Sequence, residues 1–303
     1  MTRAILALIA ALVQAAPPPQ TAPPAQPAPP STDVYLVSLA DPAKWTASSV
    51  TNISASPGYD NQPSFMRDSR SILFTSNRDG KQSDIYRYWI ADRKLTRVTE
   101  TAESEYSPTV VPRGEGFTVI QVEADNAQRL KQFDLNGRNA TLISHADEKA
   151  VGYHAWIDPN IVMLFIVDQP SMLVRFQPGG TGFEIVTSGI GRALTWITNT
   201  RSVSFTTRDE HRVWWFKKYD ADARQVTTLV QAPEGPGEPY AAWTRDGRLF
   251  TASGTRILSW KDGETGWTTV GDLSAAPVTN ISRLAVSPDG RWLAFVADPV
   301  SVQ

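Results

Sequence analysis

The sequence predicts an all-β protein, a six-bladed β-propeller with four-stranded antiparallel blades. Three observations support this: a stretch of four short strands, its repetition along the chain, and two half-copies at the chain ends. In the first stretch, residues 61–99, the expected strands are Gln62–Met66, Ser71–Ser76, Asp84–Trp89 and Leu95–Thr99. Polar turns separate them, and short strands between such turns are typical of antiparallel hairpins.

Each copy has a bulky apolar residue at the end of its first strand, and we call these residues the anchors. They lie 40 to 47 residues apart, which is the repeat length of a four-stranded propeller blade. The anchors are Phe65, Val110, Trp156, Trp196, Trp243 and Val286. We expect the three tryptophans to pack in the core between blades, because burying an aromatic side chain removes roughly 150–250 Å² from water.

The two chain ends are expected to form one blade together. The copy whose anchor is Val286 provides two strands before the chain stops at Gln303. Residues 33–41 match residues 84–92, the third strand of the first copy, at most positions. We therefore predict that Asp33–Leu39 and a strand near Val50–Ser54 complete the last blade, so that strand pairing closes the ring.

The residues before the repeats predict export. Residues 1–16 have a basic start, an apolar run and small residues at the end, the pattern of a secretory signal peptide. Residues 17–32 are expected to form a proline-rich disordered tether, and residues 33–303 the propeller. The mature protein is thus expected to be soluble, without a membrane span, monomeric, and periplasmic or secreted.

Composition and motifs exclude several function classes. The formal net charge is −2 with mixed signs, so no basic face for nucleic acid is expected. There is no cysteine, and no G-x-S-x-G, P-loop, dinucleotide-binding or H-E-x-x-H motif. The three histidines, His145, His154 and His211, lie in different copies without metal-ligand spacing. We therefore predict no catalytic residues, no metal ligands and no cofactor, although a divalent cation in the channel stays an alternative.

Polar residues precede the first strand of every copy, and these strands run in one direction along the channel. Their side chains should therefore gather at one mouth, where converging polar groups make the default binding site. The candidate residues are Asp60, Asn61, Glu103, Glu105, Tyr106, Tyr153, His154, Arg192, Glu238, Tyr240 and Arg283. The alternative is that these groups satisfy loop backbones and one another around a water-filled channel.

Two segments carry a resemblance to a known family. NQPSFMRDSRSILFTSNRDGKQSDIY (61–86) and SRLAVSPDGRWLAFVAD (282–298) resemble the WD-repeat-like units of the TolB family of periplasmic β-propellers. The same units occur in the propellers of prolyl oligopeptidase-type peptidases. The resemblance implies a six-bladed propeller and an exported binding protein. TolB itself carries a separate α/β domain before its propeller, whereas a proline-rich segment stands there in this chain.

The leading functional hypothesis is a non-catalytic exported propeller that binds an envelope protein or a peptide at the channel mouth. Two alternatives stay open. One is a metal-dependent lactonase, hydrolase or lyase that draws ligands from Asp60, Asn61, Glu105, His154 and Glu238. The other is a module that binds glycans through its tyrosines and carboxylates.

Overall fold

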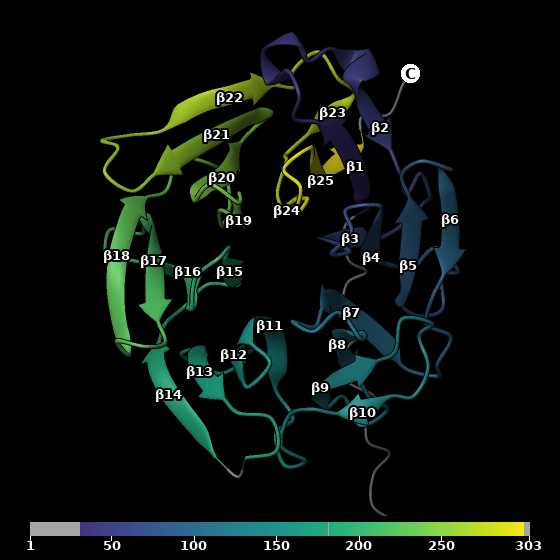
Figure 1. Ribbon diagram of the computed structural model, residues 1–303, viewed down its shortest axis with the longest axis vertical. Helices are drawn as coiled ribbons and strands as arrows, with labels where there is room; N and C mark the ends of the chain where they lie inside the picture. The colour runs from purple at the N-terminus through teal and green to yellow at the C-terminus, as the bar shows by residue number, and fades with distance from the viewer. Residues whose placement is uncertain (1–30, 181, 300–303) are drawn as a thin grey trace, which may run out of the picture.

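The computed structural model describes residues 31–180 and 182–299. The strands form six sheets arranged as a ring around a central opening (Figure 1). Each sheet is antiparallel, and its first strand lies nearest the centre. The predicted six-bladed β-propeller is thus confirmed.

Blades 1 to 5 each consist of four strands that follow one another in the sequence. From the centre outward, blade 1 is β3 (Asp60–Phe65), β4 (Ser71–Ser76), β5 (Asp84–Trp89), β6 (Lys94–Arg97); blade 2 is β7 (Ser104–Val110), β8 (Phe117–Val122), β9 (Gln128–Phe133), β10 (Thr141–Leu142). Blade 3 is β11 (Val151–Asp158), β12 (Ile161–Ile166), β13 (Met172–Phe176), β14 (Phe183–Ser188); blade 4 is β15 (Thr195–Ile197), β16 (Ser202–Arg208), β17 (Trp214–Asp220), β18 (Gln225–Gln231); blade 5 is β19 (Ala242–Trp243), β20 (Arg248–Ser253), β21 (Arg256–Lys261), β22 (Thr268–Asp272).

Blade 6 joins the two chain ends, as the sequence predicts. Its inner strands come from the C-terminal part and its outer strands from the N-terminal part: β24 (Leu284–Val286), β25 (Trp292–Pro299), β1 (Asp33–Ser38) and β2 (Val50–Asn52). Tyr35 lies opposite Phe295, and Val37 opposite Leu293. Two short 3₁₀ helices, η1 (Pro42–Lys44) and η2 (Ala47–Ser49), connect β1 to β2, and β23 (Val278–Thr279) pairs with the end of β25.

The closing strand β1 packs on both of its faces. Val34 and Leu36 belong to the apolar cluster shared with blade 1, whereas Tyr35 and Val37 belong to the cluster shared with blade 5. Successive side chains of a strand point to opposite faces, so this one strand helps to fill two of the spaces between blades.

We call the face where the inner strands begin the start face, and the face where they end the end face. Asp33 pairs with Ala297, close to the end of β25. Because β25 runs antiparallel to the inner strand β24, the chain enters the ring at the start face. Thr32 is already tied to this face, since its N–H donates to the carbonyl of Gly58 (3.0 Å).

The prediction that the tryptophan anchors are buried is confirmed for Trp156 and is wrong for Trp196. Trp156 is 7% exposed and Trp196 is 38% exposed. The indole N–H of Trp156 donates to Thr118 of the preceding blade (2.9 Å), and that of Trp243 donates to Ser204 of its preceding blade (2.7 Å).

Trp196 lacks a hydroxyl partner in the preceding blade because Met163 of blade 3 occupies the corresponding position. Strand register places Thr118, Ser204 and Met163 at equivalent positions of their blades. Met163 offers no hydroxyl, and the indole N–H of Trp196 donates instead to the carbonyl of Thr200 in its own turn (2.9 Å). The side chain therefore stays at the surface.

The predicted signal peptide (1–16) and nearly all of the predicted tether (17–32) lie outside the described residues. In the part of the chain that the structure describes, no helix has the length and apolar character needed to cross a membrane.

Candidate functional site

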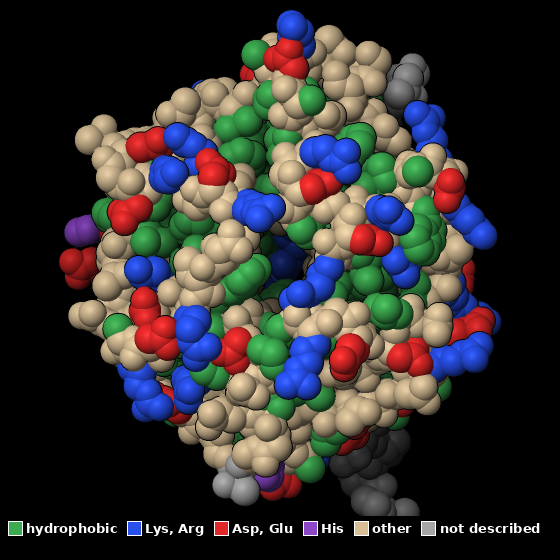
Figure 2. Space-filling model, in the orientation of Figure 1, with side chains coloured by type: hydrophobic (Ala, Val, Ile, Leu, Met, Phe, Trp, Pro, Cys, Tyr) green, Lys and Arg blue, Asp and Glu red, His purple; other side chains and the backbone are tan. Residues whose placement is uncertain are grey.

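The main cavity lies in the central channel and has a volume of about 790 Å³. We call it the channel cavity. All six anchors line its wall, and the residues that follow the inner strands at the end face, among them Arg67, Pro159, Arg245 and Pro288, line its rim. In the space-filling view, basic side chains surround the central opening and another basic surface is visible deep within it (Figure 2).

A guanidinium held between two phenols lies at the inner end of the cavity. Nη2 of Arg283 donates to the hydroxyl oxygens of Tyr153 (3.1 Å) and Tyr240 (3.2 Å). The guanidinium carbon also lies 4.9 Å from the ring centre of Tyr153 and 4.2 Å from that of Tyr240, in the range of cation–π contacts. The three residues come from blades 6, 3 and 5, so this cluster connects distant parts of the ring.

Tyr59 lies near this cluster and contacts a further tyrosine, Tyr106. The rings of Tyr59 and Tyr106 meet edge to face at 6.4 Å. Burial raises the pKa of Tyr59 above its ordinary value, and the charge of Arg283 opposes that rise. Burial likewise raises the pKa of Tyr240. These two phenols are therefore neutral hydrogen-bonding groups at physiological pH.

Positive charge exceeds negative charge around the channel cavity. Its lining includes Arg67, Arg192, Arg245 and Arg283, and one carboxylate, Asp158. Asp158 is already paired with Arg201. Within residues 31–180 and 182–299, none of the four lining arginines has a carboxylate oxygen within 4.0 Å. The cavity thus combines apolar anchors and polar side chains in its wall with an uncompensated positive charge.

Of the eleven residues proposed from the sequence, five line the channel cavity: Tyr153, His154, Arg192, Tyr240 and Arg283. His154 is 5% exposed, and its Nε2 lies 2.7 Å from Oγ1 of Thr118. Burial lowers the pKa of His154 to about 3. The imidazole is therefore neutral and helps to hold blade 3 against blade 2.

The other six candidates do not line the cavity, and three of the four carboxylates among them, those of Asp60, Glu105 and Glu238, bind the protein itself. Glu105 is fully buried and accepts hydrogen bonds from Thr101 and Gln121 (2.8 Å from the latter). Asp60 is fully buried and accepts from Ser56 (2.8 Å). Burial raises the pKa of both carboxyls. The remaining members of this group are Asn61, Glu103, Tyr106 and Glu238.

Glu238 ties blade 5 to blade 4. Its Oε1 accepts hydrogen bonds from the backbone N–H groups of Arg192 and Ala193 and from the hydroxyl of Thr206 (2.8 Å). Of the residues considered for a bound cation, Asp60, Glu105, His154 and Glu238 therefore bind different partners through their side chains, and the side chain of Asn61 donates to Thr32 (3.3 Å). Across the described residues, no three His, Asp or Glu side chains are grouped closely enough to hold a metal ion.

The end-face rim contains residues that were not predicted from the sequence. Arg67 and Arg245 each lie two positions after an anchor, at the same place in their repeats. Reading the residues after the anchors as well as those before the first strands would have found both arginines.

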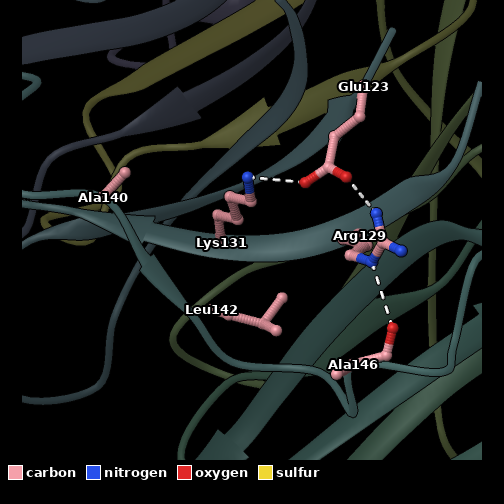
Figure 3. A pocket seen from close by; sticks show the side chains of 6 residues that line it. All are labelled: Glu123, Arg129, Lys131, Ala140, Leu142 and Ala146. Carbon is pink, nitrogen blue, oxygen red and sulfur yellow. Dashed lines mark hydrogen bonds and ion pairs between the residues drawn. The ribbon is translucent and has the colours of Figure 1, made fainter. Parts of the chain in front are cut away.

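A second depression, of about 410 Å³, lies on the outer strands of blade 2 (Figure 3). Glu123 points toward Lys131, whose Nζ lies 2.7 Å from its Oε1, and pairs with Arg129 through its other oxygen. Arg129 also donates to the carbonyl of Ala146 (3.3 Å). Because these charges satisfy one another, the depression is a weaker candidate than the channel cavity.

The fold and the cavity define the class: a six-bladed propeller with a polar cluster inside an apolar channel. Comparisons with known proteins agree with this description. Residues 30–174 match the family described as the TolB beta propeller domain. No curated protein matches the sequence significantly.

Solved structures share the fold at low sequence identity. The putative TolB from Agrobacterium tumefaciens is 13% identical with a TM-score of 0.66, over 89% of this chain and 99% of that one. TolB from Acinetobacter baumannii is 14% identical with a TM-score of 0.59, over 89% of this chain and 64% of that one. A gluconolactonase from Xanthomonas campestris is 10% identical with a TM-score of 0.62, over 90% of this chain and 99% of that one. The chain is thus similar to TolB-like β-propellers, over residues 30–174 in sequence and over most of its length in fold.

Proposed function

We propose that this protein is a periplasmic or secreted, non-catalytic propeller that binds a segment of an envelope protein, or a peptide, in the channel cavity. The observation that carries the proposal is the cavity itself, with six anchors along its wall and Arg283, Tyr153 and Tyr240 at its inner end. An apolar cavity with a few converging polar groups is the usual form of a ligand site. The resemblance to periplasmic TolB-like propellers supports export and protein binding.

The test is affinity capture of envelope proteins on the immobilised propeller, followed by variants of the cavity wall. Arg192 and Trp196 line the cavity and are exposed, so Arg192→Ala and Trp196→Ala remove ligand contacts at little cost in folding. Both changes are expected to release a specific partner. His211→Ala, in an exposed turn of blade 4, is the control and should retain it. If every captured protein stays bound to both cavity variants, the channel cavity is not the binding site.

An enzymatic alternative is favoured by one observation, the shared fold of the gluconolactonase. Elemental analysis of the purified protein, combined with an assay of lactone hydrolysis, separates the two functions. One divalent cation per chain together with hydrolysis would replace the binding proposal.

A further inference from the structure

The charges of the channel cavity indicate the chemistry of its ligand. We propose that the cavity binds an acidic peptide segment and that one of its carboxylates contacts the guanidinium of Arg283. This inference rests on the proposed function, and it specifies the partner of the same site.

Arg283 has hydrogen-bond donors left for a ligand. Its Nη2 serves the two tyrosine hydroxyls. Its Nε and Nη1 make no hydrogen bond to any described residue. Unlike Nε of Arg175, neither atom is buried without a partner, so both are accessible to a ligand. Arginine presents its donors in a fixed planar fork that matches a carboxylate. Because Tyr153 and Tyr240 already hold this fork, little conformational entropy is lost when a carboxylate binds.

The protein does not neutralise this charge. Arg283 is partly buried in the channel, where a cation without a counter-charge is unfavourable. The one lining carboxylate, Asp158, is held by Arg201. Arg67 and Arg245 at the rim add positive charge along the route from the end face to Arg283. An acidic ligand would supply the missing negative charge and would be attracted by the rim.

The wall between the rim and Arg283 favours a peptide over an acidic sugar. It combines the anchors with polar side chains, among them Ser64, Thr109 and Thr195; the anchors are Phe65, Val110, Trp156, Trp196, Trp243 and Val286. The indole N–H groups of the three tryptophans already donate to protein oxygens. Apolar side chains that alternate with carboxylates along a peptide can pack against the six anchors, and the backbone of the peptide can bind the polar side chains between them.

The experiment measures binding of fluorescein-labelled octaglutamate, blocked at its far end, by fluorescence anisotropy at low and at physiological salt. The matched probe is octaglutamine with the same label. We expect octaglutamate to bind more tightly and to weaken as salt rises. Arg283→Gln should weaken it by about 10- to 100-fold, the loss expected for hydrogen bonds to a charged group. Lys44→Gln, at a highly exposed lysine of η1, is the control and should change the affinity by less than about twofold.

Tyr153→Phe and Tyr240→Phe provide a second route if Arg283→Gln does not fold. Each removes one hydroxyl that holds the guanidinium, and each should weaken octaglutamate binding while the affinity for octaglutamine stays unchanged. Equal binding of the two probes, or full binding to Arg283→Gln, overturns the inference. So does tighter binding of a uronic acid trisaccharide than of octaglutamate. If a captured partner is lost from Arg192→Ala and Trp196→Ala but is retained by Arg283→Gln, the proposed function stands and this inference fails.

Discussion

Removal of the closing strand tests whether β1 stabilises the ring. The change is a chain that starts at Pro42 and so lacks Asp33–Ser38, compared with a chain that starts at Ser31. The aliphatic side chains of β1, Val34, Leu36 and Val37, are at most 4% exposed. Burial of such a side chain contributes about 1.5–3 kcal/mol, so the three together contribute roughly 5–9 kcal/mol.

Tyr35 adds to this loss, because its ring stacks on that of Phe295 at a centroid distance of 5.5 Å. The whole free energy of unfolding of a domain is commonly about 5–15 kcal/mol. The chain that starts at Pro42 is therefore expected to lose its cooperative urea transition, followed by tryptophan fluorescence. The chain that starts at Ser31 should keep it. Adding a peptide of residues 31–41, the segment that was removed, should restore the transition in the shorter chain.

A point substitution in β1 tests the same contribution to stability through a smaller loss in the free energy of unfolding. Leu36→Ala should lower the free energy of unfolding by about 2–5 kcal/mol. Thr51→Ala, at an exposed position of β2, should change it by less than about 0.5 kcal/mol. Equal urea midpoints for the chains that start at Ser31 and at Pro42 would refute the role assigned to β1.

The remaining predictions concern the anchors and one buried carboxyl. Trp156→Ala should lower the free energy of unfolding by about 3–5 kcal/mol, and the more exposed Trp196→Ala by less than half as much; equal losses in urea titrations would contradict the burial argument. Thr118→Val leaves the indole N–H of Trp156 and a buried imidazole nitrogen without a partner, so it should cost about 2–6 kcal/mol, whereas exposed Thr51→Val should cost little. Burial raises the pKa of Glu105 in the folded state, so the folded protein binds the proton more tightly and its stability should fall as pH rises from the unfolded pKa through the folded one. Glu105→Gln should remove this slope and raise the stability at pH 7 more than at acidic pH; a larger gain at acidic pH would show that the sign is wrong.

The closure of blade 6 was predictable because an aspartate at the start of the third strand accepts side-chain hydrogen bonds in both blade 1 and blade 6. Asp84, at the start of β5, accepts a hydrogen bond from Arg97 at the end of the outer strand (2.7 Å). Asp33, at the start of β1, accepts from Asn52 (2.9 Å) and from Ser54 (3.0 Å). The match between residues 33–41 and 84–92 therefore reflects a shared position in the blade. A local pattern of this kind can be read from a single sequence.

The side-chain directions at the channel were harder to predict. The pairing of β3 with β4 is irregular between Asn61 and Ser64, and that of β7 with β8 between Tyr106 and Thr109. Gln62 and Ser107 have positive φ angles of 59° and 55° at these points. A bulge changes which face the neighbouring side chains take. Neither residue is glycine, but each precedes a proline, Pro63 or Pro108, and a proline inside an inner strand indicates a bulge. The prediction that the first-strand carboxylates face the cavity did not take this mark into account.

The surface position of Trp196 depends on a distant residue. The position that holds a hydroxyl partner in other blades is occupied by Met163 in the preceding blade, and the repeat pattern of blade 4 alone contains no sign of this residue. Contacts between blades link residues about one repeat apart, so predicting them requires the register of two sheets at once.

The direction in which the chain enters the ring has a practical consequence. Ser31 adjoins the start face, whereas the rim that contains Arg67 and Arg245 is at the end face. Coupling the protein to a sensor chip or a bead through Ser31 would orient every molecule with this arginine rim toward the solution. Coupling through Arg245, after its replacement by cysteine, would turn the rim toward the solid support and obstruct it.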